Sequence, residues 1–431
     1  MMVSSAKTRG RPSPGGLACF LLALSLLAAG ICALAQEPTG EPDSEAPPGL
    51  RAALARIDKL LAQQPLNLDA LQYEYLVLFE NFPRRDEGKK GIFALYQLLR
   101  QNKRIEQAYA VLMKILAAYQ DNDTISNPAS PRKPIAIAAT ANVELANLYA
   151  AGMNNPYQAL DTLRRALSRY PAAYVSADAA DRRYFGSIGV IARLQMADYY
   201  VATDAYNQAT AALLALVSDF PGERVTLGDV ESPASAAAVW KLQTVLQTMP
   251  ASLSKKRRVL DTFSETAVER ETRVWLMFAK AQLLTEEGRQ VNSTGPLEDA
   301  IGALEEVLDH HPLVMLTGAD GEEPAGVRAL RLIVDICVNI FHNTDRATAE
   351  LTRYYRDLGR RPALREIAAY AVLYLADVEY NQRHNAGAAY RYYMEVVDKF
   401  SDVPVYPRKP GRHDTLNSLA EQRAERAHSE M

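Results

Sequence analysis

The chain has no surplus of either charge, since 48 lysines and arginines face 51 aspartates and glutamates and the formal net charge is −3. A protein that neutralises a run of phosphates needs a basic surplus. Nucleic acid is therefore not an expected partner. The chain's 431 residues are 48% hydrophobic, which excludes disorder as the main state and is ample for a large core.

Cysteine is scarce, with only three in the whole chain, and Cys19 and Cys32 both lie in an apolar amino-terminal segment. Removal of that segment leaves Cys337 and excludes an intramolecular disulfide. Cys337 lies in the mostly apolar run from Leu330 to Ile340. We expect it to be buried and unreactive rather than a reactive thiol.

Several common catalytic motifs are missing: GxxxxGK[ST], GxGxxG, GxSxG and HExxH do not occur. Their absence removes the commonest nucleotide-binding, hydrolase and zinc-protease classes, although it does not exclude every enzyme. We predict that the protein is not an enzyme, has no catalytic residues and uses no cofactor.

One long apolar run is present, from Leu17 to Ile31, after Lys7, Arg9 and Arg11. With the small-x-small sequence that ends at Ala35, this order predicts a secretory signal peptide over residues 1–35. Its removal would change the net charge from −3 to −6. Because no second run of this length follows, we expect no transmembrane segment in the mature chain.

Two alternatives to cleavage stay open at the amino end. The apolar segment is nearly long enough to span a thin bilayer, so it could remain as a membrane anchor. Cys32 could carry a lipid, although Ile31 before it is not the small residue expected there. The predicted location is extracytoplasmic, in a bacterial periplasm, and a membrane-anchored form is the alternative.

Three regions follow the signal segment. Residues 36–49 form a proline-rich stretch without large apolar residues, which predicts a disordered linker. Residues 50–405 have apolar residues at helical spacing and no sustained alternation of strand type, which predicts an all-α domain. Residues 406–431 begin with Pro407 and Pro410 and are polar, so a mobile tail is predicted.

Seven segments of the helical region share one pattern: an alanine, apolar residues four and seven positions later, and a helix stop five further on. An alanine permits close packing of antiparallel helices, and a proline ends the second helix. The alanines are Ala53, Ala108, Ala159, Ala209, Ala300, Ala347 and Ala389.

The units from Leu145 to Pro171 and from Leu194 to Pro221 resemble the tetratricopeptide repeat family, through Leu145-Ala146 and Met196-Ala197 in their first helices. The resemblance implies an open right-handed superhelical solenoid of antiparallel helical hairpins. It also implies that peptide segments or partner domains bind the concave face. The runner-up architecture is a closed α/α toroid.

The spacing departs from that family, because alanines 53, 108, 159 and 209 are about 50 residues apart and the family repeats every 34 residues. The sequence therefore predicts longer helices or extra intervening helices. A degenerate unit built from Ala236–Gln247 and Lys256–Val268 is expected in the long interval before Ala300.

Two segments could suggest a metal site. Adjacent His310 and His311 point about 100° apart on a helix and cannot easily share an ion, and His311 lies where other units have an aromatic residue. The acidic loop from Thr317 to Gly326 lacks calcium-ligand spacing, so a solvated turn is expected. We predict no metal site.

Two surface features have ordinary explanations as well as functional ones. The basic cluster from Lys255 to Arg258 is expected to be a solvated helix face rather than a site for anionic lipid or glycan. Asn122 and Asn292 begin glycosylation sequons in predicted loops, which would matter only in a eukaryotic source.

The candidate binding residues come from the family resemblance, in which first helices line the concave face. The residue after each small packing residue should face inward, and one more follows a turn later. Asp, Asn and Tyr side chains can hydrogen-bond an extended peptide. The candidates are Asn147, Asp198, Lys280, Asp377 and Tyr380.

The sequence thus favours an exported, non-catalytic helical-repeat scaffold. Its partners would be proteins or peptides of the cell envelope, in outer-membrane assembly, cell-wall coordination or polysaccharide export. The alternatives are an α/α-fold enzyme or binding protein that acts on envelope polysaccharide, and a purely structural spacer.

Overall fold

The computed structural model describes residues 47–431 except 64, 128–129, 131, 180–181, 229, 319–320 and 409–413. The predicted signal peptide and nearly all of the predicted linker lie outside the described residues. The chain divides into two compact units, Met1–Val111 and Leu112–Met431. Within the described ranges, no helix is long and apolar enough to cross a membrane.

The first unit is helical throughout its described part. Its helices are α2 (Pro48–Leu61), α3 (Leu68–Asn81), α4 (Asp86–Gln101) and the start of α5 (Ile105–Ala118). Ala53 and Ile57 of α2 are buried, as are Leu71 and Leu78 of α3 and Leu95 of α4. These residues recur every three or four positions, so one face of each helix forms the core.

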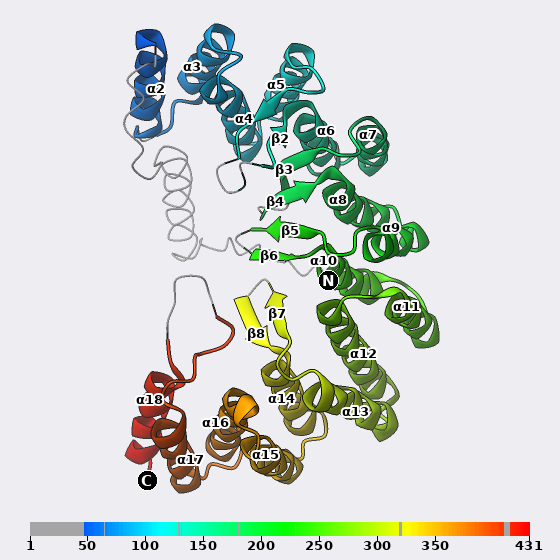
Figure 1. Cartoon of the computed structure of the whole chain (residues 1–431), viewed down its shortest axis with the longest axis vertical. Helices are drawn as coiled ribbons and strands as arrows, with labels where there is room; N and C mark the ends of the chain where they lie inside the picture. The colour runs from blue at the N-terminus through cyan, green and yellow to red at the C-terminus, as the bar shows by residue number, and fades with distance from the viewer. Residues whose placement is uncertain are drawn as a thin grey trace, which may run out of the picture. The chain divides into compact units, whose positions relative to one another are not determined.

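The second unit is a succession of antiparallel helix pairs, labelled in Figure 1. Each pair packs against the next, so the main contacts join neighbours along the chain. This confirms the predicted stack of helical hairpins, including the degenerate unit. The pairs are α6 (Ile137–Asn147) with α7 (Pro156–Arg169), α8 (Ile188–Ala202) with α9 (Tyr206–Asp219), α10 (Ala234–Thr248) with α11 (Leu253–Thr266), α12 (Arg270–Val291) with α13 (Thr294–His310), α14 (Ala325–Asp335) with α15 (Thr344–Gly359), and α16 (Arg365–Asn381) with α17 (Ala386–Phe400).

The motif that identified the units from sequence lies on the second helix of each of these pairs except the degenerate one, α10 with α11. Ala159, Ala209 and Ala300 have no exposed surface, which is expected where helix backbones approach closely. The aromatic residue before the stop leaves the helical conformation, with φ and ψ of −125° and 48° at Tyr170 and −124° and 48° at Phe220. His311 takes the same place after α13. Its predicted structural position is confirmed.

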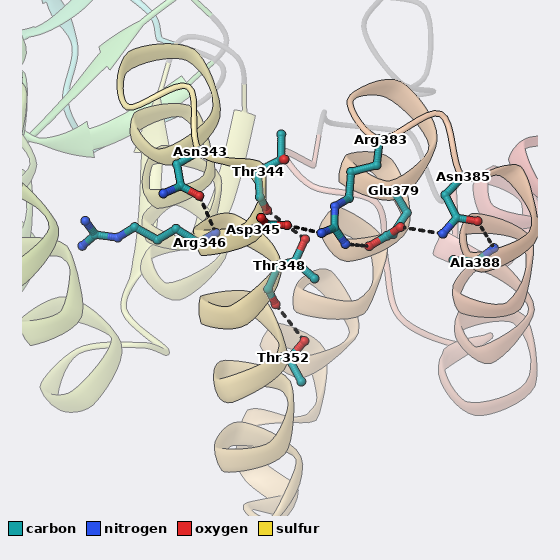
Figure 2. Close-up of polar contacts among 10 residues, drawn as sticks. All are labelled: Asn343, Thr344, Asp345, Arg346, Thr348, Thr352, Glu379, Arg383, Asn385 and Ala388. Carbon is teal, nitrogen blue, oxygen red and sulfur yellow. Dashed lines mark hydrogen bonds and ion pairs between the residues drawn. The ribbon is translucent and has the colours of Figure 1, made fainter.

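The turns inside the pairs also repeat. Asn155, Asn343 and Asn385 each precede a second helix, and each side chain accepts a hydrogen bond from the backbone N–H three residues later. The residue before each of them has a positive φ, between 50° and 52°. Figure 2 shows two of these caps, at Asn343 and Asn385.

The 50-residue spacing has a cause that the sequence analysis did not predict. Residues 137–170 and 188–220 form helix pairs of 34 and 33 residues, close to the family's 34. Between Ala53 and Ala108 two helices, α3 and α4, intervene, so an extra helix is present there, as predicted. From Ala108 onward the excess is of another kind. It consists of β-hairpins inserted between one pair and the next: β1 (Thr124–Ile125) with β2 (Ile135–Ala136), β3 (Tyr174–Ala179) with β4 (Arg182–Ser187), β5 (Arg224–Leu227) with β6 (Val230–Pro233), and β7 (Met315–Gly318) with β8 (Gly321–Pro324).

Strands β1 to β6 form one sheet in chain order, in which β2 and β3 are parallel and the other neighbours antiparallel. Strands β7 and β8 form a second sheet. The prediction of a solvated turn over Thr317–Gly326 is therefore wrong. Glu323 in β8 is only 3% exposed, and its ion pairs with Arg328 at 3.0 Å and Arg331 at 2.8 Å compensate for the burial of its charge.

One backbone hydrogen bond closes each insertion. The N–H of Ile188 donates to the carbonyl of Ala173 at 2.8 Å, and Ala234 and Ala325 donate to Glu223 and Val314 at the same distance. Leu416 donates to Val403 in the same way, at 2.7 Å. Because this hydrogen bond is the same, α18 (Leu416–Ser429) begins as the first helices α8, α10 and α14 do.

Helix α18 corrects the prediction of a polar mobile tail. Its Leu416, Ala420, Ala424 and Ala427 are at most 2% exposed, because α18 packs on α17. The polar residues that made the segment look mobile lie on its other face. A helix that is apolar on one side and polar on the other is suited to end a stack of repeats.

Candidate functional site

Four of the predicted binding residues occupy equivalent places on first helices. Asn147, Asp198, Lys280 and Asp377 each follow an alanine that is at most 4% exposed. The sequence pattern therefore found one recurring surface position. Their role in binding a partner stays a prediction.

Two of these residues connect neighbouring first helices. Asp198 of α8 pairs with Lys241 of α10, with Nζ–O distances of 2.6 and 2.8 Å. Asp377 of α16 pairs with Arg423 of α18 at 2.6 Å. Lys241 and Arg423 lie seven residues after the first residue of their helices, so the same contact is made twice. We call the two pairs the inter-helix bridges.

The bridge at Asp377 is the more enclosed one. The hydroxyl of Tyr393 also donates to this carboxylate, at 2.7 Å. Burial raises the pKa of Asp377, although Arg423 and the Tyr393 hydrogen bond act in the opposite direction. The two donors therefore offset only part of the effect that burial has on the charge.

Asn147 and Tyr380 are also engaged within the chain. Asn147 is 5% exposed, its side-chain oxygen accepts from the Tyr199 hydroxyl at 2.6 Å, and its amide donates to Glu144 at 3.4 Å. The Tyr380 hydroxyl donates to Glu430 at the end of α18. Of the five predicted residues, Lys280 alone is exposed and makes no side-chain ion pair or hydrogen bond with the described part of the chain.

A hollow of about 560 Å³ lies where first helices α10, α12 and α14 meet second helices α11 and α13. These helices are labelled in Figure 1. Sequence reasoning missed this site. It is lined by Gln243, Leu246, Gln247, Leu253, Lys256, Ala279, Ala281, Gln282, Leu283, Thr285, Glu286, Arg289, Gln290, Leu304, Leu332, Asp335 and Ile336.

The lining combines an apolar wall with amides and charges. The leucines and Ile336 supply the apolar part, and four glutamines supply groups that both donate and accept hydrogen bonds. The Nε2 of Gln243 is buried and has no hydrogen-bond partner. An unpaired buried donor is costly, so a ligand that accepts its hydrogen bond would be favoured.

The charged groups of the hollow differ in how they are engaged. Glu286 accepts from Gln290 at 2.7 Å, and Asp335 accepts from Asn339 at 2.6 Å. Within the described part of the chain, Lys256 and Arg289 make no ion pair. The lining thus combines two cations with two carboxylates, so its formal charge is balanced.

The hollow lies where the inter-helix bridges are interrupted. From α12 to α14, the bridge positions are occupied by Lys280 and Leu332, and from α10 to α12 by Thr244 and Met277. Neither combination can form an ion pair. The sequence did hold a signal for the hollow. The residue seven positions after the start of a first helix is basic in α10 and α18, at Lys241 and Arg423, but apolar in α12 and α14, at Met277 and Leu332.

Other titratable groups are committed to structure. Glu379 is 4% exposed, and its carboxylate accepts hydrogen bonds from Arg383 at 2.9 Å and Asn385 at 3.1 Å. The guanidinium of Arg383 also donates to Asp345 (Figure 2). Cys337 is buried, as expected, and burial raises its pKa to about 11. Among the described residues, no group of three His, Cys, Asp or Glu side chains could hold a metal ion.

Comparisons with known proteins identify no family. No family model matches the chain. No curated protein matches it either. Chains of solved structures do match, 27 in number.

One of these matches belongs to the solved complex of Naa15/Naa10 bound to HypK-THB. It has 12% sequence identity and a TM-score of 0.25, and it covers 88% of this chain. The aligned part spans 57% of the matched chain, and a likeness of this size carries no argument about function.

Proposed function

We propose that this protein is an exported, non-catalytic helical-repeat scaffold that holds a protein partner in a cell-envelope complex. The observation that carries the binding role is the hollow between α10, α12 and α14. It opens among first helices. The Nε2 of Gln243 has no hydrogen-bond partner there, and Lys256 and Arg289 make no ion pair with the described residues. A ligand pocket typically combines such an apolar lining with a few polar groups.

The envelope location rests on the amino-terminal sequence alone. Basic residues, an apolar run and a small-x-small sequence follow in the order of a secretory signal. Outer-membrane assembly, cell-wall coordination and polysaccharide export all use exported scaffolds, and nothing in the chain selects among them.

The test is capture from envelope extract with the full chain, tagged at its carboxyl end. One variant fills the hollow by Leu283→Trp with Leu332→Trp. A matched control places the same substitutions at Leu167 and Leu214, two half-buried leucines on second helices outside the hollow. Circular dichroism checks that all three proteins fold equally.

We expect mass spectrometry to find proteins that the native chain and the control retain and the hollow-filled variant loses. Equal retention by all three would place the partner elsewhere on the molecule. If none of them retains any protein, the scaffold proposal is wrong. Glycan-binding and hydrolysis assays would then test the alternative of an α/α protein that acts on envelope polysaccharide.

A further inference from the structure

The connection between α11 and α12, Ala267–Glu269, divides the second unit into two blocks. The first block contains α6–α11 with β1–β6, and the second contains α12–α18 with β7 and β8. We propose that this connection is a hinge, at which the second block rotates about the first turn of α12 and so widens or narrows the hollow. This proposal goes beyond the proposed function, because it concerns the free chain. Its test needs no partner, and it can fail while the proposed function stands.

The free edge of β6 is poorly suited to pair with β7. The N–H of Ala234 donates to the carbonyl of Glu223, just before β5, at 2.8 Å. The alternation of an antiparallel ladder then directs the backbone groups of residues 231 and 233 away from β5. Pro233 has no N–H, and the carbonyl of Glu231 accepts from Arg224 at 3.1 Å. In the part of the chain that the structure describes, β6 and β7 belong to separate sheets, one in each block.

The connection between α15 and α16 also has no hairpin, but backbone pairing spans it. The N–H of Arg408 donates to the carbonyl of Glu322 at 2.8 Å, and the N–H of Glu322 donates back at 3.0 Å. Arg346 of α15 also pairs with Glu298 of α13 at 2.6 Å. Backbone pairing and an ion pair between second helices therefore hold the second block together.

The first turn of α12 is the fixed end of the α11–α12 junction. Glu269, directly before α12, accepts from the backbone N–H of Gly222 at 2.7 Å and from the hydroxyl of Ser235, which is only 2% exposed. Slightly further along, the rings of Trp240 on α10 and Trp275 on α12 lie 5.4 Å apart. Buried hydrogen bonds and close aromatic packing resist separation, so this end is the pivot.

The later turns of α10 and α12 have no comparable tie. The hollow lies between them, and the positions that form an inter-helix bridge elsewhere are occupied by Thr244 and Met277. Among the described residues, the ion pair across this end joins Arg257 of α11 to Glu287 of α12, with the Arg257 side chain 38% exposed. Because an ion pair this exposed contributes little to stability, it holds the far end only weakly.

The length of α12 turns a small rotation into a large displacement. Its 22 residues, at a rise of about 1.5 Å each, place the last turn about 30 Å from the first. A rotation of about 10° at the first turn would move the last turn by about 5 Å, which is comparable with the size of a side chain. Rotation of rigid blocks about a hinge is one of the established ways in which proteins open and close around ligands.

The experiment is double electron–electron resonance between nitroxide labels on the full chain, which measures a distribution of distances. The far-end pair is Lys255→Cys with Val291→Cys, at the third residue of α11 and the last residue of α12. The matched control is Gln208→Cys with Thr248→Cys, at the third residue of α9 and the last residue of α10. All four residues are exposed, and the control spans the junction that carries the Asp198 bridge.

A third pair tests the pivot. Glu231→Cys with Met315→Cys labels exposed residues on the neighbouring strands β6 and β7. Circular dichroism checks that every labelled protein folds as the native chain does. In all of them alanine replaces the native cysteines, Cys19, Cys32 and Cys337.

We expect the far-end distribution to be at least about twice as wide as that of the control, and the pivot distribution to be as narrow as the control. Equal widths for the far-end and control pairs would overturn the hinge. Equally wide distributions for the far-end and pivot pairs would overturn it too, because the blocks would then separate without a pivot.

A restored bridge provides the second test. Thr244→Asp with Met277→Lys gives α10 and α12 the residues that Asp198 and Lys241 supply between α8 and α10. The double variant should narrow the far-end distribution toward that of the control, and Thr244→Asp alone should leave it unchanged. Narrowing by both variants, or by neither, would contradict a far end that moves because its bridge is missing.

Discussion

Two regions of the second unit use equivalent helix positions in opposite ways. Between α8 and α10 and between α16 and α18, Asp198 and Asp377 reach a basic residue of the next first helix. Between α10, α12 and α14, the corresponding positions cannot pair, and a hollow of about 560 Å³ opens. The same scaffold position is therefore closed by an ion pair in one region and left accessible in another.

The difference shows how one region of a repeat array can acquire a binding site with little loss of folding stability. A bridge between half-exposed charges contributes little to stability, so its loss in one region is tolerated. The helices continue to pack through their buried alanines and leucines. Binding groups can consequently replace bridging groups without loss of the fold.

The largest expected effect separates the packed end of the stack from the hollow. Leu416→Ala removes a side chain with no exposed surface under α18 and should lower the free energy of unfolding by about 2–5 kcal/mol. Leu283→Ala, at the half-buried wall of the hollow, should cost about 1 kcal/mol. Denaturant titration followed by circular dichroism measures both. Equal losses would show that the hollow wall is packed like the core.

The inter-helix bridges should differ from one another. Asp377→Ala leaves Arg423 and the Tyr393 hydroxyl without their acceptor and should cost about 2 kcal/mol. Asp198→Ala removes a bridge whose carboxylate is 45% exposed and should cost less than about 1 kcal/mol. The same titration compares them, and a larger loss at Asp198 would contradict the view that enclosure strengthens the bridge.

Gln243 and Gln195 both have buried side-chain atoms without a hydrogen-bond partner, and replacing each in turn tests which of them contributes to partner binding. Gln243→Leu removes a buried Nε2 without a partner, and Gln195→Leu removes a buried amide whose Nε2 and Oε1 both lack one, so each should leave stability unchanged or raise it by about 1 kcal/mol. Only Gln243 lines the hollow. Partner capture should therefore decrease in the Gln243 variant alone, and a decrease in both would mean that the hollow is not the binding site.

The smallest expected effect comes from closing the hollow with a new bridge. Leu332→Glu places a carboxylate opposite Lys280, as Lys241 lies opposite Asp198. A double-mutant cycle with Lys280→Ala should give a coupling of about 0.5 kcal/mol. Partner capture should decrease at almost unchanged stability. Zero coupling would show that the two positions are not equivalent to a bridge.

The candidate site could be predicted only in part. The alanine before each candidate residue located one recurring position on the first helices, because helix packing imposes a small residue there. Which of these positions stay accessible depends on the neighbouring helix, about 40–50 residues away in the chain. Asn147, Asp198 and Asp377 were therefore placed correctly on first helices, but their partners and the hollow itself were not predicted.

The sequence by itself determined the helix pairs, their close-packing alanines and the residues that end each second helix. These features depend on helical periodicity and on local backbone preferences, which act over a few residues. The amino-terminal export signal is likewise a sequence property and stays a prediction.

Only the tertiary structure decided the β-hairpins, the docking of α18 and the position of the hollow. The strands are short, and several contain glycine, proline or charged residues, so their own alternation is weak and pairing with adjacent strands stabilises them. Gly321, at φ 125°, even permits the backbone of Arg408 to approach where a Cβ atom would lie 2.1 Å from its carbonyl oxygen. The approach of Arg408 to Gly321 joins residues far apart in the chain, which is why local patterns did not reveal it.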